Sequence, residues 1–373
     1  MRFLHTADWH IGKKLHGYDL LQEQEQAIQQ IRQIAATEAV DAIVIAGDLY
    51  DRTVPATDAV ELFNKWIQQL NLTDGWPLLA ISGNHDSPIR LETGSAWFSQ
   101  SEFYLRTKLA EAFQPIEFPD TQVFLLPYFE PIAARLYFEQ EYKTIQAAIT
   151  DVLAEMKQQF DPAKAHVLVT HFFVSGSSRT DSETTLTIGG LDGISLSALA
   201  DFDYVALGHL HGKDALKAER VRYSGSPLKY SLSERTQQKG VWIVDVGPDH
   251  FDCQFREITP PKDIQLVTAS FQELLDPAYY ELIQRDAFLA IQLTDRAVIP
   301  NMMNRLRAVY PYILQVERQT RQTQTTTLAQ PVQQLAPPAL FQQFFTKATN
   351  ETLTATQSDW LARGLAAIKE AEQ

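Results

Sequence analysis

Carboxylate, amide and imidazole side chains recur in short motifs along the first two thirds of the sequence. In order, the motifs are Asp8-Trp9-His10, Gly47-Asp48-Leu49-Tyr50-Asp51, Gly83-Asn84-His85-Asp86, His171 and Gly208-His209-Leu210-His211. Oxygen and imidazole ligands without thiolate suit Mn, Fe or Zn better than Cu(I) or structural zinc. The candidate ligands are too many for one tetrahedral ion, so the set predicts two divalent cations. A carboxylate with two oxygens, such as that of Asp48, can bridge them.

The spacing inside two of these motifs favours a shared site. Asp8 and His10 lie two positions apart, as do His209 and His211, so an extended backbone turns both members of a pair to the same side. Two cations about 3.5–4 Å apart would hold a phosphodiester and lower the pKa of a bridging water to make the nucleophile. The predicted chemistry is therefore phosphoester hydrolysis.

A short apolar run precedes nearly every motif and indicates a buried strand. The runs cover residues 2–7, 42–46, 78–81, 166–169 and 204–207. In sheets covered on both faces, ligands collect beyond the carboxyl ends of the strands. A single histidine or Gly-Asp pair after a strand is usually structural, whereas five such motifs in one chain favour a site. We therefore expect five strand ends to deliver the motifs to one rim.

Helical periodicity separates these strands. Apolar residues recur about every 3.6 positions over residues 19–38, 57–70 and 144–160, and residues 121–127 indicate a further strand. Alternating strands and helices predict an α/β layered domain. Residues 221–224, 240–246 and 251–258 indicate strands joined by turns, which predicts a second, antiparallel sheet packed on the first. The expected fold class is α/β: a two-sheet sandwich flanked by helices, followed by a small α+β domain and a C-terminal helical segment.

Changes in composition divide the chain. Pro260-Pro261 ends a first domain of residues 1–259, because adjacent prolines remove backbone donors and disfavour continued sheet or helix. Residues 260–320 predict the small α+β domain, with strands at 263–268, 287–293 and 312–317 and a helix at 302–309. Residues 321–338 are rich in Gln, Thr and Pro and predict a flexible linker.

Residues 339–373 predict two short amphipathic helices. Their apolar edges comprise Leu340, Phe341, Phe344 and Phe345 in one, and Trp360, Leu361, Leu365 and Ile368 in the other. Two such helices after a linker cannot easily bury their aromatic faces alone. Either they dock back on the body, or they bind a partner as a helix pair or as a helix in a groove.

Charge and cysteine content limit the classes of partner and compartment. The 373 residues carry a net charge of −14, so the chain has no global attraction to nucleic acid. If it acts on DNA, the cations must come from bound metal, local Lys/Arg patches or a partner. The single cysteine, Cys253, allows no intrachain disulfide and fits the cytoplasm. Neither a signal peptide nor an apolar run of roughly 18 residues is evident, so we expect no membrane association.

The motifs resemble those of the calcineurin-like metallophosphoesterase superfamily and, within it, the SbcD-type nuclease subunits of bacteria. The likeness covers the whole chain and includes Tyr223-Ser224-Gly225-Ser226-Pro227. It implies one metal held by Asp8, His10, Asp48 and His211, and another held by Asp48, Asn84, His171 and His209. The usual metal of the family is manganese.

The same resemblance implies that His85 is catalytic. It would meet the leaving oxygen or steady the scissile phosphate, a general-acid role that needs a protonated imidazole. Our hypothesis is that Asp51 orients His85 and keeps it protonated. Asp86 is either a site residue or a turn residue, and Arg52 either contacts a phosphate or is simply exposed. The other histidines, His5, His16, His166 and His250, are expected to be structural or on the surface.

The implied activity is that of a DNA nuclease subunit in repair, recombination and replication. Such proteins degrade double-stranded ends with ATP and cut single strands or hairpins. The implied partners are an SMC-like coiled-coil ATPase of the SbcC type, gripped by the C-terminal helices, and a second nuclease subunit, together forming a heterotetramer. Residues 260–320 would be a capping domain. The alternatives are a stand-alone phosphodiesterase for nucleotides or small phosphodiesters, and a metal-bound scaffold, against which the intact His85 argues.

Overall fold

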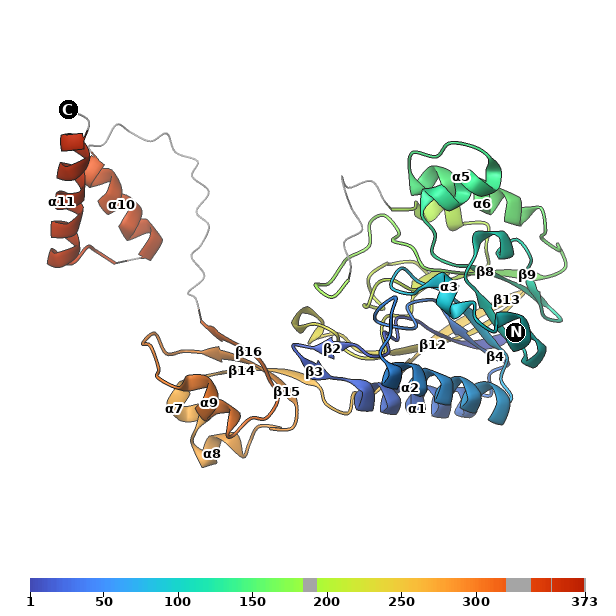
Figure 1. Cartoon of the computed structure of the whole chain (residues 1–373), viewed down its shortest axis with the longest axis horizontal. Helices are drawn as coiled ribbons and strands as arrows, with labels where there is room; N and C mark the ends of the chain where they lie inside the picture. The colour runs from blue at the N-terminus through green and yellow to red at the C-terminus, as the bar shows by residue number, and fades with distance from the viewer. Residues whose placement is uncertain (184–192, 320–336, 350, 372–373) are drawn as a thin grey trace.

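Two packed β-sheets form the body of the protein, as the computed structural model shows for residues 1–183, 193–319, 337–349 and 351–371 (Figure 1). The first sheet has the strand order β13-β12-β1-β4-β5-β6. Its parallel strands are β1 (Arg2–Thr6), β4 (Ala42–Ile45), β5 (Leu78–Ile81) and β6 (Phe103–Arg106). The hairpin of β12 (Gly240–Gly247) and β13 (His250–Glu257) completes it, with β12 antiparallel to β1.

The second sheet has the order β11-β10-β9-β8-β7. Its parallel strands are β8 (Thr121–Leu126), β9 (Ala165–Thr170), β10 (Tyr204–Leu207) and β11 (Val221–Tyr223). The short strand β7 (Ile116–Glu117) pairs antiparallel at one edge. The predicted sandwich is therefore present.

The prediction that residues 221–258 form a separate antiparallel sheet is wrong. The β12–β13 hairpin extends the first sheet, and β11 extends the second sheet in parallel beside β10. The error has a physical reason: alternation and turns indicate that a strand exists, but its partner is set by long-range packing. Here β12 pairs with β1, more than 230 positions away, with Leu4 opposite Ile243.

The central strands are apolar on both sides because both faces of the sheets are covered there. In β4, Ala42 and Val44 face the layer between the sheets, while Ile43 and Ile45 pack in the cluster that contains α1 (Leu21–Thr37) and α2 (Thr57–Ile67). A π-helical turn, Gln68–Thr73, continues α2. The outer face of the second sheet packs against α6 (Ile145–Lys157) and α5 (Pro131–Phe138). Short helices α3 (Pro88–Leu91) and α4 (Ser95–Phe98) lie between β5 and β6.

A small α+β unit follows the sandwich. Its three parallel strands are β14 (Ile264–Ala269), β15 (Phe288–Leu293) and β16 (Ile313–Arg318), and its short helices are α7 (Phe271–Leu274), α8 (Pro277–Tyr280) and α9 (Met302–Arg307). Ile264, Phe288 and Leu314 belong to the same apolar cluster as α1. Near them the small hairpin of β2 (Lys14–Leu15) and β3 (Tyr18–Asp19) places the Tyr18 hydroxyl 3.1 Å from the Pro311 carbonyl oxygen. The unit therefore shares its inner edge with the sandwich.

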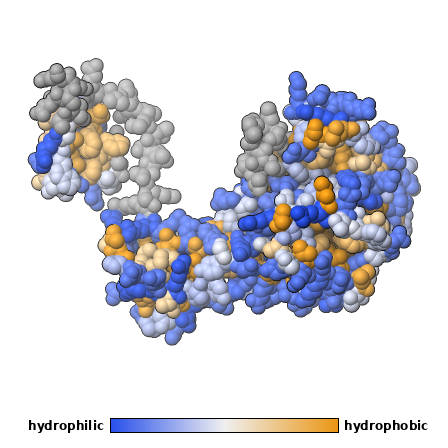
Figure 2. Space-filling model, in the orientation of Figure 1, coloured by the Kyte–Doolittle hydropathy of each residue, from blue (hydrophilic) through white to orange (hydrophobic). Residues whose placement is uncertain are grey.

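Two helices end the chain, α10 (Pro337–Thr349) and α11 (Ala355–Ala371). They contact each other, and Figure 2 shows apolar residues gathered on their surface. Leu340, Phe341, Phe344 and Trp360 are exposed. Most of the predicted linker and the side chain of Ile368 lie outside the described residues. None of the described helices combines the length and apolarity that a bilayer crossing requires.

Candidate metal centre

The seven predicted ligand residues meet at one rim of the sandwich. Asp8, Asp48 and Asn84 follow strands β1, β4 and β5 of the first sheet, whereas His171 and His209 follow β9 and β10 of the second. Asn84 is half-buried, and the other ligand residues are buried. The rim is thus built by both sheets, whose carboxyl ends open on the same side.

One half of the cluster contains Asp8, His10 and His211, each of which offers a ligand atom within 4.8 Å of the others. The Nε2 atoms of His10 and His211 face each other at 3.1 Å. His10 Nε2 also lies 3.4 Å from Oδ2 of Asp48. Two ring nitrogens and a carboxylate oxygen pointing at one small volume match the donor set of a divalent cation.

The other half contains His171, His209 and Asn84. Asn84 Oδ1 lies 3.1 Å from His171 Nε2 and 2.9 Å from His209 Nδ1. His171 Nε2 is 3.3 Å from Oδ2 of Asp48, the same oxygen that approaches His10. Asp48 therefore stands between the two halves, where the sequence predicted a bridging carboxylate.

The hydrogen bonding of His171 requires a positive charge at the centre. Its Nδ1 lies 2.7 Å from the carbonyl oxygen of Ala46, which can only accept, so Nδ1 carries a proton. In a neutral ring the Nε2 lone pair would then face the oxygens of Asp48 and Asn84. In the metal-free chain a second proton, on Nε2, removes this unfavourable contact. Burial acts to lower the pKa of His171, but the charge of Asp48 outweighs burial and raises the pKa to about 9. A bound cation would take the place of that proton, so the residues present fit a metal pair.

The buried carboxylates of Asp8 and Asp48 also require positive charge at the centre. Burial raises the pKa of Asp8 to about 7, although His171 and His211 oppose the rise. Burial likewise acts to raise the pKa of Asp48, yet His171 and His10 hold that pKa well below its ordinary value. Isolated charges in a buried site are costly unless they are paired or coordinate metals. The cluster is therefore charge-matched to cations.

Four of the predicted ligand residues have a strained backbone conformation. Asp8, His10, Asp48 and His209 have φ angles of 53°, 43°, 50° and 96°, in a region that side-chain-bearing residues seldom adopt. The conformation is held by neighbours: Gln24 Nε2 donates to the carbonyl oxygens of Trp9 and His10 at 3.1 and 2.7 Å. Such strain persists only where the surroundings enforce it, and it clusters at functional sites.

Two motif glycines allow the strand ends to approach. A Cβ on Gly83 would collide with the Asp48 carboxylate and backbone nitrogen, and one on Gly208 would collide with the Ala46 carbonyl oxygen. Each glycine therefore permits a contact on which the position of a ligand depends. This explains why Gly precedes Asn84 and His209 in the sequence.

His85 lies beside the cluster, with its ring centre 4.7 Å from that of His10. Its Nδ1 is 2.9 Å from the main-chain carbonyl oxygen of Asp51, so this nitrogen carries a proton and the ring orientation is fixed. The Asp51 carboxylate instead accepts from Lys13 Nζ at 2.7 Å and lies 3.7 Å from His10 Nδ1. Asp51 thus reaches His85 through its backbone and His10 through its side chain.

Asp86 is a turn residue, one of the two roles considered for it. Its carboxylate accepts hydrogen bonds from the backbone N–H groups of Leu49, Tyr50 and Gly83 at 3.1, 3.0 and 2.9 Å. It thereby ties the turn after β4 to the turn after β5. Arg52 is 79% exposed, with Nε 3.7 Å from Asp51 Oδ2.

The remaining histidines lie where the sequence suggested. His5 and His166 are buried, and His5 contacts the Tyr204 hydroxyl at 3.0 Å and the Leu207 carbonyl oxygen at 3.2 Å. Burial lowers the pKa of His5 to about 3, so it stays neutral. His16 and His250 are exposed.

Residues that the sequence did not single out hold His211 from behind. Ser182 Oγ lies 2.6 Å from His211 Nδ1 and donates to Glu234 Oε1 at 2.5 Å. Because the hydroxyl proton goes to Glu234, Ser182 accepts from Nδ1, and the Nε2 lone pair is left facing the cluster. Glu183 accepts from the His211 backbone nitrogen at 2.7 Å. Their contacts are long-range, so neither motif nor spacing indicates them.

A buried lysine neutralises Glu234. Lys239 Nζ lies 2.5 Å from Glu234 Oε2, 2.8 Å from the His211 carbonyl oxygen and 3.0 Å from Ser226 Oγ. Although burial acts in the opposite direction, Lys239 holds the pKa of Glu234 well below its ordinary value. Ser226 belongs to the motif at residues 223–227, in which a Cβ on Gly225 would lie 2.7 Å from the His211 carbonyl oxygen. Residues 223–227 therefore pack against the main chain of His211 and help to fix its position.

Replacing Ser182 by alanine should weaken metal binding at one of two sites by about 10–100-fold, because outer hydrogen bonds of this kind orient ligating histidines. Calorimetric titration with Mn²⁺ measures the change. Ser178→Ala is the matched control, since the Ser178 hydroxyl contacts the Ala215 carbonyl oxygen at 3.4 Å and not a ligand. If Ser182→Ala bound Mn²⁺ at both sites with unchanged affinity, Ser182 would not be needed to orient His211.

Comparison with known proteins finds a family match at each end of the chain. The calcineurin-like phosphoesterase family matches residues 1–213, and the type 5 capsule protein repressor C-terminal domain matches residues 260–349. A crystal structure of a dimetal phosphatase from Danio rerio matches 69% of this chain and 96% of that chain, with a TM-score of 0.42 and 12% identity.

Two curated relatives match over essentially the full length. The SbcD subunit of the nuclease SbcCD from Staphylococcus epidermidis is 32% identical over 374 residues, which cover 100% of each chain. The protein of the same name from Staphylococcus saprophyticus is 32% identical over 373 residues, covering 99% of each. The chain therefore belongs to the calcineurin-like phosphoesterase family and, within it, to the SbcD family of nuclease subunits.

Proposed function

We propose that this chain is the metal-dependent DNA nuclease subunit of a complex with an SMC-like coiled-coil ATPase of the SbcC type. The proposal includes ATP-dependent exonuclease action on double-stranded DNA and endonuclease action on single strands and hairpins. The observation that carries it is the convergence of seven metal-type ligands on one rim, with His85 beside them. The full-length relatives, both named as SbcCD nuclease subunits, support the substrate class.

Asp8, His10, Asp48 and His211 would hold one ion, and Asp48, Asn84, His171 and His209 the other; we propose manganese. When bound, the ions would clamp the phosphodiester and lower the pKa of a water to supply the nucleophile. The chain's own residues fix the ligands: Ala46 orients His171, Ser182 orients His211, and the Asp8 carboxylate accepts from the His209 backbone nitrogen at 2.9 Å. The site is therefore preorganised for a fixed substrate position.

His85 would act on the leaving group. The hydrogen bond from Nδ1 to the Asp51 carbonyl oxygen fixes its ring, so that Nε2 is the nitrogen that would meet the leaving oxygen as a proton donor. The proposed orienting role of Asp51 then rests on its main chain. Its carboxylate, paired with Lys13, lies on the His10 side of the site.

His85→Gln should keep both ions and lose most turnover, by roughly 10²–10⁴-fold, because it removes a proton donor and not a ligand. His209→Ala should lose metal as well as turnover, because the Asn84–His209 contact belongs to the ligand cluster. Metal content measured by mass spectrometry, beside rates, separates the two. Equal metal loss in both variants would place His85 in the coordination shell.

The substrate class can be tested with the purified chain and Mn²⁺. Linear DNA and a small chromogenic phosphodiester are offered separately, and the DNA should be cleaved with the higher kcat/KM. A chain that cleaves only the small diester would instead be the stand-alone phosphodiesterase considered above. Omission of Mn²⁺ and addition of a chelator give the blank.

We propose that residues 1–259 are the nuclease domain, 260–320 a capping domain, 321–338 a linker and 339–373 the partner-binding segment. Support for the last comes from exposed apolar side chains on α10 and α11, including Phe344, which is 67% exposed. In the nuclease domain Ile89 and Trp97 on α3 and α4 are 80% and 77% exposed, and they are a candidate surface for the homodimer within the heterotetramer. The free thiol of Cys253 is compatible with a cytoplasmic location.

Truncation before Pro337 should abolish co-purification with the coiled-coil ATPase, because it removes both exposed apolar helices. Phe344→Glu is the corresponding point variant and should weaken the same interaction. Trp97→Glu is the reciprocal control, since it should reduce dimerisation in sedimentation measurements while the ATPase still binds. Retention of the ATPase by the truncated chain would contradict the assignment of residues 339–373.

A further inference from the structure

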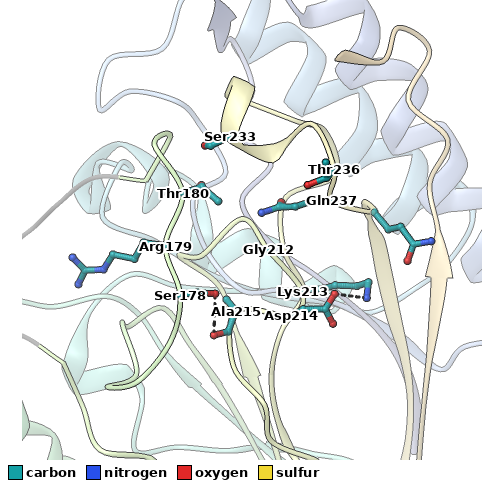
Figure 3. A pocket seen from close by; sticks show the side chains of 11 residues that line it. Ser178, Arg179, Thr180, Gly212, Lys213, Asp214, Ala215, Ser233, Thr236 and Gln237 are labelled. Carbon is teal, nitrogen blue, oxygen red and sulfur yellow. Dashed lines mark hydrogen bonds and ion pairs between the residues drawn. The ribbon is translucent and has the colours of Figure 1, made fainter. Parts of the chain in front are cut away.

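Two hollows flank a single loop beside the metal centre, and Arg179 lines both of them. One, of about 260 Å³, is polar and is lined by Ser178, Thr180, Gly212, Lys213, Asp214 and Gln237 among others (Figure 3). The other, of about 210 Å³, extends to His171 and His209 and is lined by aromatic residues together with Glu130, Pro131 and Ile145. Its aromatic lining comprises Tyr128, Phe129, Phe172 and Phe173.

Arg179 is held by an aromatic ring rather than by an acid. The carbon of its guanidinium lies 3.8 Å from the centre of the Phe173 ring. Over the described parts of the chain, no carboxylate lies within the 4.0 Å of an ion pair with Arg179, and its side chain is exposed. In Figure 3 it extends away from Lys213 and Gln237. A stacked but unpaired guanidinium keeps its five donors available for an anion.

The polar hollow is a weaker candidate for an anion. Its lysine, Lys213, already lies 2.7 Å from the carboxylate of Asp214, so its charge is largely matched. The aromatic hollow is different, because two predicted metal ligands, His171 and His209, line it together with Arg179. In a chain with a net charge of −14, a guanidinium that has no ion-pair partner among the described residues is a local exception beside the predicted metal ligands.

Proteins bind a single nucleic-acid strand with aromatic side chains that lie next to positive charge. Successive bases stack on aromatic rings, and the phosphates between them follow positive charge. Tyr128 and Phe173 are the half-buried members of the aromatic lining, and Tyr128 has its ring centre 5.5 Å from that of Phe172. Because His171 and His209 line the same hollow, a base that enters it would bring its phosphodiester close to predicted metal ligands.

We propose that the aromatic hollow binds one unpaired nucleobase of the DNA strand being cut, while Arg179 binds a phosphate flanking that base. This inference rests on the proposed nuclease function and extends it, because it assigns the subsite that distinguishes a nucleotide strand from a small phosphodiester. Arg179 and Phe173 are then substrate-binding residues, and Phe173 also preorganises the guanidinium.

The test uses the full chain with Mn²⁺ and a fluorescent single-stranded oligonucleotide, with kcat and KM measured at several salt concentrations. Phe173→Ala should raise KM about tenfold, since stacking on an aromatic side chain contributes on the order of 5–150-fold in binding. Arg179→Gln should raise KM and reduce the slope of log affinity against log salt by about 0.7, the value for one phosphate contact to a single strand.

Arg220→Gln is the matched control. Arg220 also stacks on a phenylalanine, Phe251, at 4.5 Å, but it precedes β11 and so lies at the opposite end of the sheet from the metal rim. Thermal unfolding and Mn²⁺ titration of each variant establish that fold and metal binding are retained. Wild-type KM and salt slope in both Phe173→Ala and Arg179→Gln would overturn the inference. A wild-type chain that cleaves no DNA at all would overturn the proposed function instead.

Discussion

The structure depends on bringing two buried carboxylates and several imidazoles to a single rim, where they can coexist only around positive charge. Asp48 makes this plain, because one of its oxygens lies within 3.4 Å of both His10 and His171. Without an ion, His171 must carry an extra proton to satisfy its neighbours, and its pKa is raised to about 9. The metal requirement of the protein is therefore a consequence of how its own groups are buried.

That convergence needs two sheets rather than one. The first sheet supplies the carboxylates, the amide and the His10 imidazole, and the second supplies His171, His209 and His211, so the centre forms only when the sheets pack with their carboxyl ends on the same side. Left-handed backbone at Asp8, His10, Asp48 and His209 turns the chain sharply at the ends of β1, β4 and β10. The apolar layer between the sheets stabilises this strained arrangement, and residues such as Val44 and Val167 are completely buried in it.

The sequence indicated the strands of the rim and the ligands after them, because fully buried strands and Gly-bounded motifs are local signals. It did not indicate the partner of each strand: β12 pairs with β1 across most of the chain, and no local pattern encodes that choice. The same limit applies to the site. Ser182, Glu234 and Lys239 have ordinary surroundings in sequence, and their role follows only from the fold that places them behind His211. The residue types likewise do not indicate that His85 contacts the Asp51 carbonyl oxygen, because that contact involves the main chain.

The Asp86 carboxylate joins the turn that carries Asp48 to the turn that carries His85. Both turns are therefore parts of one rigid block, and a displacement of either moves the other with it. The chain beyond Ser87, with α3 and α4, is attached outside this block. Insertions or rearrangements there can reshape the outer surface of the protein while the spacing between Asp48 and His85 stays constant.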